Sequence, residues 1–141
     1  MIKILLPVDG SESSTRAAGH LAKIIGWYKG PVEIHLLNVQ HPLSGDVGRF
    51  LDSEQVRDFH REEGMKALAS ARALLDEAGI AYAAHIGVGT AAGVITQYAR
   101  EKQCDQIVMG CRGYGSFASL FMGSVATEVI RSSEAPVLVV K

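Results

Sequence analysis

Short apolar runs alternate with segments of helical periodicity along the whole chain, and this alternation limits the possible folds most. Each run ends at turn residues, and the segments between runs place their apolar residues three or four positions apart. Strands that alternate with helices predict a parallel sheet with helices on both faces, and nearly continuous apolar strands are typical of such covered sheets. We expect the strands at residues 2–8, 32–39, 80–88, 106–109 and 136–140.

The segments between these strands predict four helices. The first carries Ser11 or Ser13 as its N-cap and Gly26 as its C-cap. Gly64 lies inside the second and costs about 1 kcal/mol relative to alanine, so we expect that helix to bend or to start late. Residues 40–53 have no period and are predicted to form a loop. The expected helices are residues 13–26, residues 54–78, a helix capped by Thr90, and residues 124–131.

Composition agrees with one globular domain that spans residues 1–141. A formal charge of -1 argues against a nucleic-acid-coating surface, and no apolar stretch approaches the roughly 20 residues of a membrane span. The N-terminus lacks a signal-peptide pattern, so a cytosolic protein is expected. Cys104 and Cys111 form neither a disulfide framework nor a zinc site. His35 falls within a predicted strand, where a core or partner-facing position is expected.

The loops richest in glycine and polar residues follow the first and fourth strands. They are Val8-Asp9-Gly10-Ser11 and Gly110-Cys111-Arg112-Gly113. In open parallel sheets, ligands bind at the carboxyl ends of strands where the strand order reverses. If both loops line one site, the first and fourth strands are neighbours and the strand order is 3-2-1-4-5. The competing order, 2-1-3-4-5, places the crevice between the first and third strands instead.

The glycine-rich segment that ends at Gly123-Ser124 carries the strongest chemical signal. Glycines let backbone N–H groups approach an anion closely, and the helix that begins at Ser124 adds unpaired N–H donors and a partial positive charge. Arg112 is the one cation between Gly110 and Ser124, so backbone dipoles would hold most of a phosphate's charge. A phosphate-binding loop is one interpretation, and a plain connection to a capped helix is the other.

The spacing G-x2-G-x9-G-[S/T], present at Gly110, Gly113, Gly123 and Ser124, resembles the nucleotide-binding signature of the universal stress protein family. Residues 4–11, 107–110 and 136–140 look like the same family, so the resemblance covers the whole chain. It implies an adenine nucleotide α-hydrolase-like fold and membership of the ATP-binding subgroup.

The resemblance also implies roles for individual residues. Asp9 would accept hydrogen bonds from ribose hydroxyls, although from the residues alone a turn and cap role for Asp9 is the stronger reading. The backbone of Val39 would meet the adenine edge, and Asn38 stands where the family often has histidine. The predicted nucleotide-binding residues are Pro7, Val8, Asp9, Val39, Met109, Gly110, Arg112, Gly113, Gly123, Ser124 and Val125.

Function is predicted from the same resemblance, as a cytosolic ATP-binding regulator of the stress response that senses nucleotide. ATP, with Mg²⁺ and no built-in metal site, is the expected ligand. The protein would transmit its nucleotide state through a protein partner or through a homodimer. The homodimer would form by the apolar last strand, Val137 to Val140. Residues between Gly110 and Ser124 include no Asp, Glu, His or Gln that orients water, so turnover should be slow or absent. A slow ATPase and an interaction module without nucleotide are the alternatives.

Overall fold

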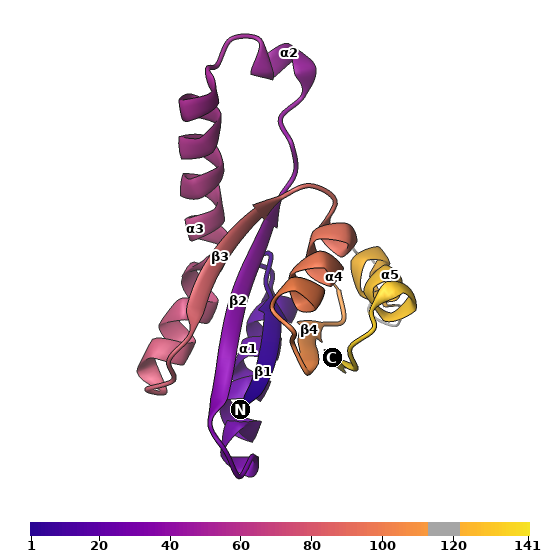
Figure 1. The fold of residues 1–141 in the computed structure, drawn as a ribbon. Coiled ribbons are helices and arrows are strands. Elements are labelled where there is room, and N and C mark those ends of the chain that lie inside the picture. Colours follow the sequence, from indigo (N-terminus) through magenta and orange to yellow (C-terminus); the bar gives the residue numbers. More distant parts are fainter. Residues whose placement is uncertain (113–121) are drawn as a thin grey trace.

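The sheet has five parallel strands in the order β3-β2-β1-β4-β5 (Figure 1). The computed structural model describes residues 1–112 and 122–141, so the predicted site residue Gly113 lies outside the described residues. The order confirms 3-2-1-4-5 and excludes 2-1-3-4-5. The strands are β1 (Ile2–Pro7), β2 (Val32–Gln40), β3 (Ala83–Val88), β4 (Gln106–Gly110) and β5 (Val137–Val140).

Helices cover both faces of this sheet, as the alternating pattern predicts. They are α1 (Glu12–Ile24), α2 (Gly45–Gly48), α3 (Ser53–Glu77), α4 (Ala91–Glu101) and α5 (Ser124–Ser132), with a 3₁₀ turn η1 (Ile25–Trp27) after α1. The prediction of a plain loop over residues 40–53 is wrong, because β2 continues to Gln40 and α2 follows. The Ser44 side chain caps α2 by accepting from the Val47 N–H. A helix of four residues is too short to show an apolar period.

Two further bounds differ from expectation because of how helices end. Gly26 does not cap α1, since the chain tightens into η1 beyond Ile24. β3 starts at Ala83 rather than residue 80, because the Ile80 N–H donates to the Leu75 carbonyl at the end of α3. Gly79 reverses the chain there with φ +71°, a backbone conformation that favours glycine. At the other end of α1, Ser11 is the N-cap and accepts from the Ser14 N–H.

Gly64 is explained by close packing between α3 and β3. The helix runs through Gly64 from Ser53, so the expected late start is wrong. A Cβ atom at position 64 would lie 2.7 Å from Cδ1 of Ile86. The glycine therefore lets the helix approach the edge strand, and this packing offsets its low helix propensity.

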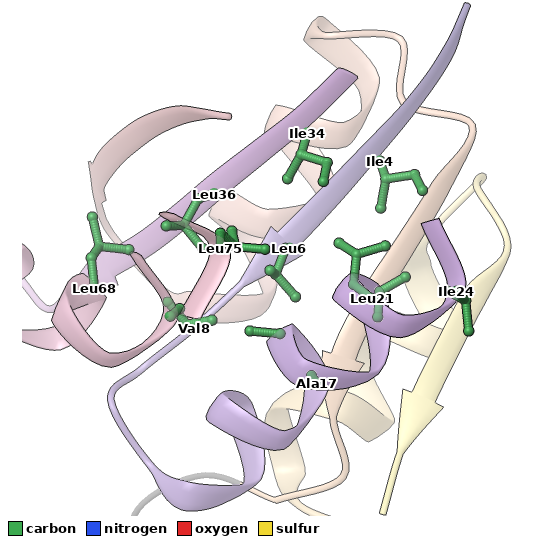
Figure 2. Close-up of a cluster of buried hydrophobic side chains, with 13 residues drawn as sticks. Ile4, Leu6, Val8, Ala17, Leu21, Ile24, Ile34, Leu36, Leu68 and Leu75 are labelled. Atoms are coloured by element: carbon green, nitrogen blue, oxygen red, sulfur yellow. The ribbon is translucent and has the colours of Figure 1, made fainter. Parts of the chain in front are cut away.

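Adjacent residues of the central strands enter two separate hydrophobic clusters. Leu6 and Leu36 pack with α1 and α3 on one face, where Figure 2 shows the cluster. Leu5 and Leu37 pack with α4 and α5 on the other. Both faces of β1 and β2 are therefore buried, which explains why these strands are apolar without alternation. Among residues 1–112 and 122–141, no helix is both long and apolar enough to cross a bilayer.

One polar cluster lies beneath α4. His35 on β2 is 7% exposed, with its Nδ1 2.9 Å from Nε2 of His85 on β3 and its Nε2 2.6 Å from a carboxylate oxygen of Glu33. The ring of Tyr98 on α4 meets the His85 ring edge-on, at 5.6 Å between centroids. His35 is therefore buried, which is the first of the two positions expected for it. Burial, then the charges of His35 and Lys102, lower the pKa of His85 below its ordinary value of 6.5.

Stability is expected to fall as the pH drops through 6.5 and below, in part through His85. The lowered pKa means that the unfolded chain binds this proton more tightly than the folded one. The contribution is fully present above pH 6.5 and is lost as pH falls through the folded-state value. Urea denaturation between pH 8 and pH 5 measures the free energy of unfolding of wild type and His85→Gln. This free energy should fall less steeply with pH in the variant, and the difference in slope should correspond to at most about one bound proton. His20→Gln on α1 is the control, and superimposable curves for wild type and His85→Gln would contradict the assignment.

Candidate functional site

A cavity of about 360 Å³ opens at the carboxyl edge of the sheet, where β1, β2 and β4 end. It brings together residues that are far apart in the sequence, from the turn after β1 to the start of α5. Every predicted site residue within the described part of the chain lines it, which leaves only Gly113 unplaced. These lining residues are Pro7, Val8, Asp9, Val39, Met109, Gly110, Arg112, Gly123, Ser124 and Val125.

The turn after β1 sets Asp9 at the rim of this cavity. Gly10 adopts φ 87°, which favours glycine, and one Asp9 carboxylate oxygen accepts from the Ser11 N–H at 2.9 Å. Ser11 in turn accepts from the Ser14 N–H at 3.2 Å and caps α1. Asp9 therefore has the turn role that its sequence context favoured, and it also faces the cavity.

Asn38 joins the ends of β1 and β2 beside the cavity. Its side chain is buried, and Nδ2 donates to the Val8 carbonyl at 2.9 Å. The Gln40 side chain donates to Oδ1 of Asn38 at 2.7 Å, so the amide is held from both sides. Sequence reasoning treated Asn38 only as a departure from the family pattern. A polar residue inside an apolar strand was the signal that could have identified it as a positioning residue.

Gly110 lies against the first turn of α1. A Cβ atom there would come within 2.7 Å of the Ser13 carbonyl carbon and oxygen. Two residues later, the Arg112 N–H donates to Oγ of Ser13 at 3.1 Å. The glycine is therefore required by backbone packing between β4 and α1, in addition to any contact with a ligand.

The two ends of the glycine-rich segment are joined by a backbone hydrogen bond. The Gly123 N–H donates to the Cys111 carbonyl at 2.8 Å, and the Cys111 N–H donates to the Val140 carbonyl at 2.9 Å. Gly123 is the N-cap of α5, so Ser124 and Val125 follow in its first turn. The end of β4 and the start of α5 are thereby held side by side at the cavity.

Three helices begin at the cavity, and each contributes a lining residue from its first turns: Ser14 of α1, Ala91 of α4 and Ser124 of α5. Their N-terminal N–H groups and helix dipoles favour an anion. Arg112 adds a formal positive charge. Within residues 1–112 and 122–141, no group of three His, Cys, Asp or Glu side chains is placed to hold a metal ion.

Several lining residues were missed by sequence reasoning. They come from the end of β2, from α3 and from the start of α4, where nothing in the local pattern indicates a site. Ala67 illustrates the difficulty, because its helical spacing predicts only a core position. The missed residues include Gln40, His41, Ala67 and Ala91.

The model of the universal stress protein family matches residues 1–141. The chain belongs to the universal stress protein family. A curated relative, universal stress protein MJ0531 of Methanocaldococcus jannaschii, is 34% identical over 99% of this chain and 81% of its own length. Universal stress protein YxiE of Bacillus subtilis is 32% identical over 99% of this chain and 98% of its own length.

Solved structures of universal stress proteins share the fold. The structure of MJ0577 superimposes with a TM-score of 0.81 at 29% identity, over 99% of this chain and 94% of that one. A universal stress protein in complex with cAMP has a TM-score of 0.74 at 25% identity, covering 99% and 97% of the two chains. A family protein from Arabidopsis thaliana with AMP bound has a TM-score of 0.71 at 25% identity, covering 100% and 92%. The sheet and helices thus form an adenine nucleotide α-hydrolase-like fold.

Proposed function

We propose that this universal stress protein binds ATP in the cavity at the carboxyl edge and acts as a regulatory nucleotide sensor. The single observation that carries the proposal is the convergence of the predicted residues on one cavity, from Pro7 to Val125. Relatives of the same fold with bound AMP and cAMP support an adenine nucleotide as the ligand class.

The cavity offers different chemistry at its two sides. Apolar side chains at the ends of β1, β2 and β4 suit a base, and the Val39 backbone is the proposed contact for the adenine edge. Asp9 at the rim is the proposed acceptor for ribose hydroxyls. Gly110, Gly123 and the first turn of α5 are the proposed phosphate contacts, with Gly113 as a further one in the segment outside the described residues. A Mg²⁺ ion would arrive with the triphosphate, since Mg²⁺ usually binds through substrate phosphates.

The regulatory output is proposed to pass through a homodimer or a protein partner. Within the described structure, β5 is the edge strand beside β4. Its outer backbone groups can therefore pair with a second copy of the chain. Cys104 and Cys111 are both free, which supports the proposed cytosolic location. The wider role, in a stress response, is part of the same proposal.

Thermal unfolding with added nucleotide tests the binding. After bound nucleotide has been stripped, ATP·Mg²⁺ at one hundred times its dissociation constant should stabilise the fold by about 2.7 kcal/mol. AMP and cAMP, compared at equal concentration, give the preference among adenine nucleotides. Phosphate release measured in the same samples separates a sensor from a slow ATPase.

Gly123→Val is the matched loss-of-binding variant, because a branched side chain at the N-cap of α5 would crowd the proposed phosphate contacts. Gly26→Ala is the control, since no atom lies within 4 Å of a Cβ at that position. The proposal predicts that the ATP shift is lost in the first variant and kept in the second. An unchanged shift in Gly123→Val, or no shift in wild type, would reject binding at this cavity.

A further inference from the structure

A second cavity, of about 540 Å³, lies on the α3 side of the sheet near the end of β3. Figure 1 shows α2 and the N-terminal turns of α3 standing beyond the end of the sheet. Residues of both helices line the cavity. None of its lining residues lines the nucleotide cavity. The two cavities adjoin at two places: His41 of the first precedes Pro42 of the second, and Gln40 of the first pairs with Val88 of the second across β2 and β3.

The walls of the second cavity combine an apolar surface with positive charge. Leu43, Val56, Ile86 and Val88 provide the apolar surface, and Val88 is 48% exposed although it is a large hydrophobic residue. Arg57 and Arg61 are the charged lining residues, and no acidic side chain lines the cavity among the described residues. Small-molecule sites typically have this volume and a mainly apolar lining with a few polar groups.

The two arginines are exposed to solvent and form no ion pair within the described part of the chain. They stand four residues apart on α3, so they lie on one face of the helix and repel each other. Neither makes an ion pair or side-chain hydrogen bond with another described residue. A carboxylate placed between two guanidinium groups would relieve the repulsion and accept charge-assisted hydrogen bonds.

His60 supplies an independent observation at the same cavity. It lines the cavity, is only 5% exposed, and its buried Nδ1 has no hydrogen-bond partner in the described structure. A buried polar atom without a partner costs about 1–3 kcal/mol. Because a water-sized atom does not reach Nδ1, a ligand oxygen would become its partner only after the His60 ring turns into the cavity.

We propose that this cavity is a second ligand site, for a small amphipathic carboxylate with an alkyl or aryl body. The apolar walls take the body of the ligand, and Arg57 and Arg61 take its carboxylate. The site is independent of the proposed nucleotide site, so both ligands bind to one molecule at the same time.

Isothermal titration with decanoate tests the proposal, using the full chain saturated with ATP·Mg²⁺. Decanoate should bind, and 1-decanol should bind at least about tenfold more weakly, because it cannot form the ionic hydrogen bonds that contribute about 1.5–3 kcal/mol each. The double variant Arg57→Gln/Arg61→Gln should lose at least about tenfold in affinity for the same reason. Arg100→Gln/Arg131→Gln, which removes two positive charges from α4 and α5 outside the cavity lining, is the charge-matched control and should bind normally.

Val56→Trp gives a second test, since an indole at this position would fill the cavity without removing charge. It should abolish decanoate binding and leave the ATP-induced thermal shift intact. The proposal is overturned if wild type does not bind decanoate, if decanol binds equally well, or if both variants bind like wild type. Competition between ATP and decanoate would place the carboxylate in the nucleotide cavity and would also overturn it.

Discussion

Replacing Gly110 with alanine is expected to destabilise the protein and to remove nucleotide binding together. The new Cβ would lie 2.7 Å from the carbonyl carbon and oxygen of Ser13, so the backbone of β4 or α1 must move. Such overpacking typically costs about 1–3 kcal/mol. Because Gly110 and Arg112 both line the cavity, the same displacement would alter the proposed phosphate contacts. Urea denaturation and nucleotide titration on one preparation measure both effects.

Gly19→Ala is the matched control for that experiment. Gly19 lies inside α1, and the nearest atom to its added Cβ, Cδ1 of Leu74, is 3.6 Å away, an ordinary contact. This change should stabilise the protein by about 1 kcal/mol through helix propensity and leave binding unchanged. If Gly110→Ala kept wild-type stability and affinity, the close contact with Ser13 would not control the site.

Replacing Val139 with proline is expected to convert the proposed homodimer into monomers. The Pro136 carbonyl accepts from Ile107 of β4, and the Val140 carbonyl accepts from Cys111 directly after β4. Every second residue from Pro136 onward therefore directs its backbone groups toward β4. In a parallel strand, the residues between them, Val137 and Val139, direct theirs toward the open edge. Proline at position 139 therefore removes an outward donor and keeps the ladder to β4.

Light scattering after size exclusion measures the outcome. Val139→Ala shortens the side chain but keeps the N–H, so this control should stay dimeric if backbone pairing holds the dimer. Far-UV circular dichroism checks that the proline variant retains its sheet. A dimeric Val139→Pro protein would remove β5 from the interface, and a monomeric wild type would reject the dimer itself.

Strand order could be predicted because chemistry and topology coincide at one edge of the sheet. The order 3-2-1-4-5 followed if the polar and glycine-rich loops after β1 and β4 share a site, and the observed sheet has this order and not its competitor. The set of predicted nucleotide-binding residues came instead from the resemblance to the universal stress protein family, position by position. Local sequence pattern and residue chemistry predicted a feature where that feature depends on residues close together in the chain.

Features that depend on distant partners could not be predicted. Gly64 has low helix propensity, and its reason is the close contact with Ile86 on β3. The Asn38 side chain donates to the Val8 carbonyl, which lies directly after β1 and far away in the sequence. The second cavity joins three segments, and none of them carries a motif. Helical propensity and periodicity describe neighbours along the chain, so they contain no information on these contacts.

The backbone hydrogen bond from Gly123 to Cys111 has an evolutionary consequence. It joins the end of β4 to the start of α5, so these two elements keep their relative position through a contact that does not involve residues 113–121. The cost of closing a chain segment rises only slowly with its length. A relative with a different number of residues between these two positions is therefore expected to retain this hydrogen bond and the same fold.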